Sequence, residues 1–138
     1  MSFDRRITPF RPDLADERLR GRVEAERFSA GRLRRVTAPS APVRRHPAPD
    51  APLDTEALMG ERVTVYDDHE GWAWGQLEAD GYVGYLPSAA LDEPGPEATH
   101  KVRALRGFVF PGPNLKLPHA GFLSLGARVA VTDIQGDY

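Results

Sequence analysis

The middle of this chain is repeated, less clearly, at its end. Residues 36–72 align without a gap on residues 102–138 when they are shifted by 66 positions. The first copy continues past Trp72 for about twenty residues to Leu91, whereas the second copy ends at Tyr138. The repeat predicts two tandem small domains, and we expect the second to be incomplete and the chain to be part of a longer protein. Identical residues recur at Val36/Val102, Ala38/Ala104, Val43/Val109, Pro47/Pro113, Pro52/Pro118, Gly60/Gly126, Arg62/Arg128, Val63/Val129, Val65/Val131 and Asp67/Asp133.

The amino-acid composition excludes several classes of function for this chain. The sequence has no cysteine, so these residues supply neither a disulfide nor a thiolate nucleophile. It has no glycine-rich phosphate loop, metal-ligand cluster or carboxylate pair, and we expect no catalytic residue, cofactor or metal. No segment approaches the roughly 20 apolar residues of a membrane span, and no apolar run follows the N-terminal arginines as in a secretory signal. We therefore expect a cytoplasmic protein without a membrane partner.

Charge is unevenly distributed. Residues 1–35 contain ten Arg against six Asp and Glu, while residues 36–138 contain eight Lys and Arg against fourteen acids. An arginine-rich arm could bind phosphate. Alternatively, it lies along the acidic body of its own protein, which the alternation of arginines with acids over residues 16–27 favours.

Strand and turn patterns predict the local structure. Asp13 is expected to cap a short N-terminal helix, and a strand is expected from about Arg32. Residues 39–52 contain five prolines and are expected to form a long loop, within which residues 43–45 could form one short edge strand. Residues 53–59 are expected to form a helical turn. Strands are predicted at 62–66, 72–77 and 82–86, with a turn at 67–71, a hairpin turn at 78–81 and one helical turn at 87–91.

These elements are typical of small barrels of the SH3-like type. The predicted fold is mainly β, with two tandem SH3-like barrels, the second incomplete, and a short helical N-terminal arm. The expected boundaries are 1–35 for the arm, 36–93 for the first barrel and 99–138 for the second, truncated barrel. Units of about 60 residues bury only roughly 60% of their unfolded surface, so we expect them to dock on each other or on a further domain.

Three motifs carry a resemblance to known proteins. Residues 60–65 (GERVTV), 71–72 (GW) and 80–86 (DGYVGYL) resemble bacterial SH3-like domains. Together with residues 12–14 (PDL), 21–25 (GRVEA) and 71–74 (GWAW), they look like the N-terminal region of NlpC-type cysteine peptidases, which carry two SH3-like domains ahead of a papain-like domain. The resemblance covers the chain but not the catalytic domain.

The resemblance implies a role in peptidoglycan metabolism. The family cleaves the bond between D-glutamate and a diamino acid in cell-wall peptides with a cysteine nucleophile and a histidine. This chain has no cysteine, and its histidines (His46, His69, His100 and His119) have no common spacing. The implied partners are a C-terminal catalytic domain of the same protein and a peptidoglycan stem peptide. In the family, the first SH3-like domain helps to wall off the cleft, which selects peptides with a free N-terminal L-alanine.

The aromatic residues of the first barrel are the candidate substrate surface. Trp72 and Trp74 lie two residues apart and point to the same face of one strand. We expect Trp72 and Tyr85 to form the aromatic core and Trp74 and Tyr82 to be exposed or interfacial. The predicted substrate-binding residues are Trp74, Tyr82, Glu70 and Asp68, with the two acids available to a substrate ammonium. These acids have a simpler explanation as part of a polar hairpin turn.

Two other functions remain open on the sequence alone. One is a stand-alone SH3-like module that binds peptidoglycan or a peptide with no enzyme attached. The other is a nucleic-acid-binding protein that uses the arginine-rich arm and barrel aromatics for stacking, although we expect no nucleic-acid partner.

Overall fold

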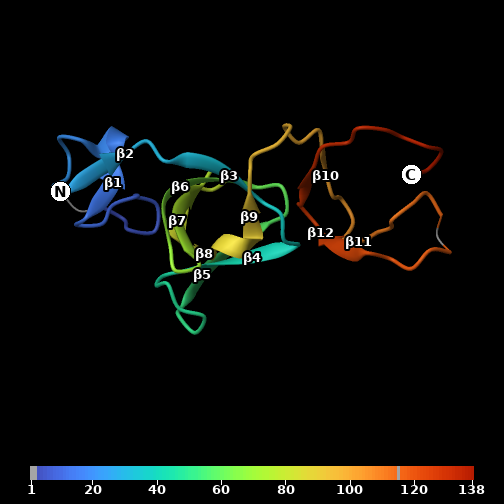
Figure 1. The fold of residues 1–138 in the computed structure, drawn as a ribbon, viewed down its shortest axis with the longest axis horizontal. Helices are drawn as coiled ribbons and strands as arrows, with labels where there is room; N and C mark the ends of the chain where they lie inside the picture. Colours follow the sequence, from blue (N-terminus) through green and yellow to red (C-terminus); the bar gives the residue numbers. More distant parts are fainter. Residues whose placement is uncertain (1–2, 115) are drawn as a thin grey trace.

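The computed structural model describes residues 3–114 and 116–138 and is mainly β. The molecule is elongated: an N-terminal arm lies at one end, a seven-stranded sheet in the middle and a smaller β unit at the other end (Figure 1). Helical structure in the described part is limited to two 3-10 turns, η1 (Glu17–Leu19) and η2 (Ser88–Ala90). No helix in this part is long and apolar enough to cross a membrane.

The arm is folded as strands. β1 (Leu14–Asp16) pairs in parallel with β2 (Arg27–Ser29), and η1 follows β1 directly. The predicted N-terminal helix is therefore wrong. Residues 14–16 are all buried on the neighbouring sheet, so packing against the barrel overrides the local preference for a helix.

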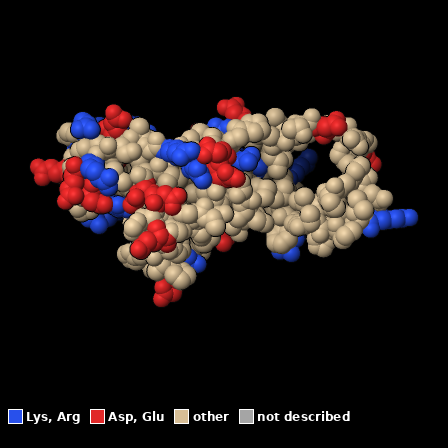
Figure 2. Space-filling model, in the orientation of Figure 1, with Lys and Arg blue, Asp and Glu red and all other residues tan. Residues whose placement is uncertain are grey.

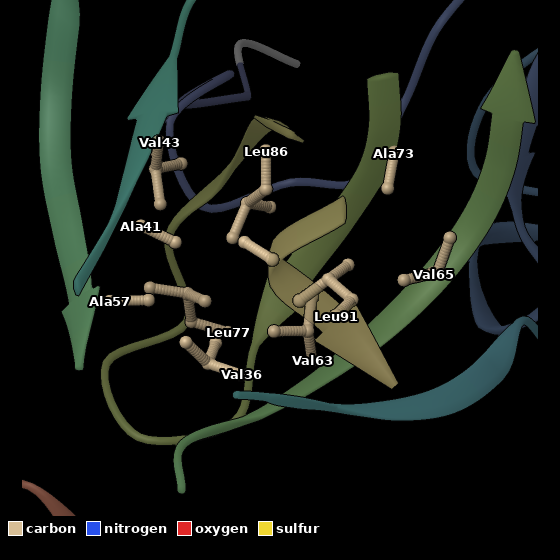
Figure 3. Packing of buried hydrophobic residues seen from close by; sticks show 11 residues of the cluster. Val36, Ala41, Val43, Ala57, Val63, Val65, Ala73, Leu77, Leu86 and Leu91 are labelled. Carbon is tan, nitrogen blue, oxygen red and sulfur yellow. The ribbon is translucent and has the colours of Figure 1, made fainter. Parts of the chain in front are cut away.

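The central sheet has the strand order β5-β4-β8-β7-β6-β3-β9, and all its neighbours are antiparallel. It curls around one apolar cluster, to which all seven of its strands contribute side chains such as Val36, Val43 and Leu86 (Figure 3). This arrangement is an SH3-like β fold with an open sheet. Its strands are β3 (Arg32–Val36), β4 (Ser40–Arg44), β5 (Leu53–Leu58), β6 (Arg62–His69), β7 (Trp72–Leu77), β8 (Val83–Pro87) and β9 (Leu91–Asp92).

Two elements differ from the sequence prediction. Residues 53–58 form β5 rather than a helical turn. The short strand considered at residues 43–45 is the longer β4, which begins at Ser40 and ends at Arg44. In β4, Ala41 and Val43 are buried while Pro42 lies between them, facing away from the core. The inward alternation is that of a strand, but the surrounding prolines conceal it in the sequence.

Strand β6 contains a bulge. Val65 pairs with Gly75, but the next pair along β7 joins Trp74 to Asp67, so Tyr66 is an extra residue. Val63 and Val65 belong to the central apolar cluster, whereas Tyr66 packs on the opposite face of the sheet.

The second unit repeats the pairing of the first. In the first unit β4 pairs with β5 from Ser40–Leu58 to Val43–Thr55, and β11 pairs with β12 from Arg106–Ser124 to Val109–Gly121. These positions differ by the 66 residues of the sequence repeat. The strands are β10 (His100–Lys101), β11 (Arg106–Val109), β12 (Gly121–Ser124) and β13 (Arg128–Val129).

Hydrogen bonds outside the strands follow the same repeat. The Val36 amide donates to the Glu61 carbonyl at 2.9 Å, and its counterpart, the Val102 amide, donates to the Ala127 carbonyl at 2.8 Å. The two units meet where the Arg128 amide donates to the Met59 carbonyl at 2.7 Å. This contact places the second unit against the turn that precedes β6.

Candidate functional site

Strand β7 divides its side chains between the two faces of the sheet. Ala73 and Leu77 lie in the central cluster, while Trp74 lies in a second, outer cluster with Leu14, Tyr66 and Val83. Alternation places Trp72 on the same outer face.

The prediction of which aromatic residues are buried is wrong. Trp74 is only 4% exposed, whereas Trp72, Tyr82 and Tyr85 are half-buried. Trp74 is covered because the N-terminal arm lies over it, a contact that strand alternation within the barrel does not reveal. Its ring centroid lies 5.6 Å from that of Tyr66.

Arg11 holds the arm over Trp74. Its guanidinium lies 4.6 Å from the Trp74 ring centroid and pairs with both oxygens of Asp13. It also donates to Asp67 of β6 at 3.1 Å and to the Tyr85 hydroxyl at 3.4 Å. The hydrogen bond to Asp13 raises the pKa of Arg11 against the opposing effect of burial, so this side chain stays cationic.

A buried carboxylate makes the second attachment of the arm. Asp16, 3% exposed, accepts hydrogen bonds from the Tyr66 hydroxyl and from the Arg18 side chain. Burial pulls the pKa of Asp16 upward, but the hydrogen bonds from Arg18 and Tyr66 outweigh it and the pKa is lowered. Burial and the hydrogen bond to Asp16 raise the pKa of Tyr66.

These contacts favour one interpretation of the arginine-rich arm. Arg11 and Arg18 are both occupied by acids, and Arg18 also donates to Gln76 of β7 at 3.2 Å. Figure 2 shows basic and acidic side chains interspersed over the arm end of the molecule. This part of the arm lies along its own protein.

The predicted substrate-binding residues fall in three places. Asp68 accepts from the Ser88 hydroxyl at 2.6 Å, and Glu70 is exposed at the tip of the β6–β7 turn with a φ of 51°. Tyr82 packs against the central cluster instead of joining Trp74. The structure therefore does not bring the four residues together. It leaves half-buried Trp72 beside the acidic turn, because Trp72 pairs with His69 across β6 and β7.

Sequence reasoning missed Arg11, Asp16 and Tyr66. Arg11 precedes the PDL motif and Asp16 follows it, but their partners lie 50 to 74 residues away. The one local signal was Tyr66 itself, the only aromatic residue of β6, which stands directly before two acids.

The described residues show no preassembled metal site: no group of three or more His, Cys, Asp or Glu side chains lies close enough together to bind an ion. The outer cluster is bordered by the Arg11 guanidinium and by the carboxylates of Asp13, Asp16 and Asp67, each of which pairs with an arginine. Such groups can bind a ligand or hold another segment, and the sequence supplies no thiol beside them.

Comparison with known protein families finds a match for the centre of the chain. Residues 43–91 match the family described as the bacterial dipeptidyl-peptidase Sh3 domain. No curated protein matches the chain. The match runs from β4 to the start of β9, so it covers most of the central sheet. The chain contains a bacterial SH3-like region of a kind found in peptidases.

Proposed function

We propose that this chain is the non-catalytic SH3-like region of a cysteine endopeptidase that cleaves γ-D-glutamyl–diamino acid bonds in peptidoglycan-derived peptides. The match of residues 43–91 to the SH3 domain of bacterial dipeptidyl-peptidases carries the proposal. The nucleophile then belongs to a catalytic domain of the same protein, because this sequence contains no cysteine. The enzyme would act in the cytoplasm on peptides released from the cell wall.

The region's role in this proposal is to select the substrate. A free peptide N-terminus is an ammonium group, which carboxylates and the faces of aromatic rings attract. The β6–β7 turn provides both, since half-buried Trp72 lies beside Glu70, whose side chain is 82% exposed. Asp68 is partly occupied by Ser88 and serves as a second acid. Trp74, buried beneath the arm, would hold β7 in place without contacting the substrate. Tyr82, packed against the central cluster, would likewise have a structural role.

Titration of the full chain with L-alanyl-γ-D-glutamyl-diaminopimelate, followed by the indole N–H resonances, tests this role. We expect the Trp72 resonance to move and the Trp74 resonance to stay. N-acetylation of the peptide removes the ammonium charge and should weaken binding by about tenfold, the scale of one charge-assisted hydrogen bond. Glu70→Gln should have a similar effect, whereas Glu26→Gln, an exposed acid on the arm, should not.

Equal affinity for the free and acetylated peptides would contradict substrate selection at this surface. The attached enzyme is tested separately, by looking in the reading frame for a downstream Asp-Cys-Ser-Gly-like motif and a later histidine. If neither follows, binding without an enzyme supports the stand-alone module.

A further inference from the structure

A cleft of about 840 Å³ separates the central sheet from the second unit. β3 and β6 line one side, and β10 and β13 line the other. The second unit, which forms one side of the cleft, lies at the opposite end of the central sheet from the arm (Figure 1).

Four basic side chains line this cleft in two facing pairs. Arg35 of β3 lies directly opposite Arg62 of β6, and Lys101 of β10 lies directly opposite Arg128 of β13. Residues directly opposite in an antiparallel pair have their Cβ atoms about 4.5–5.5 Å apart, and like charges there destabilise the sheet. Lys101 and Arg128 therefore repel each other across the strand pair. Arg35 also lies directly opposite Asp92 of β9, and this acid partly offsets the repulsion from Arg62.

The two pairs occupy equivalent positions of the repeat. Lys101 and Arg128 follow Arg35 and Arg62 by 66 residues each. Many surface positions differ between the two copies, but both members of this pair are basic in each copy. The docking of the units brings the four cations to one cleft.

Among the described residues, none of these four side chains has an ion-pair or hydrogen-bond partner, whereas Arg11 and Arg18 of the arm both pair with acids. The Nε atom of Arg35 is buried and unpaired, an arrangement that costs free energy unless a ligand accepts its hydrogen bond. Two acids, Glu78 and Glu97, also line the cleft but form no ion pair with these cations.

We propose that this cleft binds a small oxyanion with at least two anionic groups, either phosphates or carboxylates. Guanidinium groups bind both by paired N–H···O hydrogen bonds. One anionic group would lie between Arg35 and Arg62 and the other between Lys101 and Arg128, so that the ligand bridges the two units. The inference is independent of the proposed function, because the cleft shares no residue with the Trp72 surface.

Titration of the full chain with inorganic tripolyphosphate and, separately, with citrate tests the proposal and distinguishes phosphate from carboxylate ligands. We expect at least one probe to bind and to move the Arg35 Nε–H resonance. The double variant Arg62→Gln/Arg128→Gln should bind it about tenfold more weakly or worse, as expected from the loss of charge-assisted hydrogen bonds. The control Arg22→Gln/Arg27→Gln makes the same change in net charge at exposed arm positions and should bind as the parent does.

Thermal unfolding provides a second measurement that does not require the variant to bind. Without a probe, the cleft variant should melt at or above the temperature of the parent, because its like-charge pairs are relieved. With saturating probe, the parent should be the more stable of the two. Equal weakening in the control variant, an unmoved Arg35 resonance at saturation, or no binding of either probe at millimolar concentration would overturn the proposal.

Discussion

The guanidinium of Arg11 lies 4.6 Å from the ring centroid of Trp74 and covers the indole. Because Arg11 also reaches Asp67 and Tyr85, one side chain joins the arm to three strands of the central sheet. The arm and the outer face of the central sheet therefore form a second core. Four predictions test this packing and the repeat.

Trp74→Ala should destabilise the chain by about 3–5 kcal/mol, the usual cost of removing a buried large aromatic side chain. Trp72→Ala should cost about 1 kcal/mol, since that ring is only half-buried. Urea unfolding of both variants measures the difference. A larger loss for Trp72→Ala would show that the buried and half-exposed positions on β7 are the reverse of those described.

Arg11→Ala should release the arm while the central sheet stays folded. The lost hydrogen bonds to Asp67 and Tyr85 and the lost contact with Trp74 should lower stability by about 1–3 kcal/mol. Hydrogen exchange should show faster exchange at the β1 and β2 amides and little change in β3. Arg5→Ala, at an exposed position without a side-chain partner among the described residues, is the matched control.

Asp16→Asn should lower the free energy of unfolding at neutral pH. It should also make that free energy less dependent on pH under acidic conditions. The pKa of Asp16 is lower in the folded chain than in the unfolded chain, where aspartate titrates near about 3.9. Its contribution is therefore complete above about pH 4 and is lost as the pH falls through the folded-state pKa. Urea unfolding at pH 7 and pH 3 should show a difference of about 1–3 kcal/mol at the higher pH that shrinks at the lower. Asp50→Asn, an exposed acid, should show no such trend.

Gly60→Ala should detach the second unit, and Gly71→Ala should not. Both glycines have a φ of 85°, so both substitutions carry the same backbone strain of about 1 kcal/mol. A Cβ at Gly60 would lie 1.9 Å from the Arg128 carbonyl oxygen, whereas one at Gly71 meets no atom within 4 Å. Faster hydrogen exchange at the Arg128 amide in the first variant alone is the expected result. Equal effects would mean that strain, not the contact with Arg128, dominates.

The sequence predicted those features that depend on short-range pattern. The alternation of β7 and the hairpin to β8 follow from residues adjacent in the chain, and the 66-residue repeat gives the same strand pairing in both units. The strand at Leu14 could not be predicted locally, because its stability comes from contacts with Trp74 and Tyr66 more than fifty residues away. The reversal of Trp72 and Trp74 has the same cause: which tryptophan is covered depends on where the arm lies.

The bulge in β6 determines how the arm can be attached. A regular strand directs neighbouring side chains to opposite faces, so it could offer either Tyr66 or Asp67 to the arm, but not both. The one extra residue places both on the outer face, where Tyr66 donates a hydrogen bond to Asp16 and Asp67 accepts one from Arg11. A single contact would leave the arm free to pivot, whereas two consecutive contacts of opposite polarity fix its direction. A one-residue insertion in β6 thus specifies the orientation of a segment that precedes it in the chain.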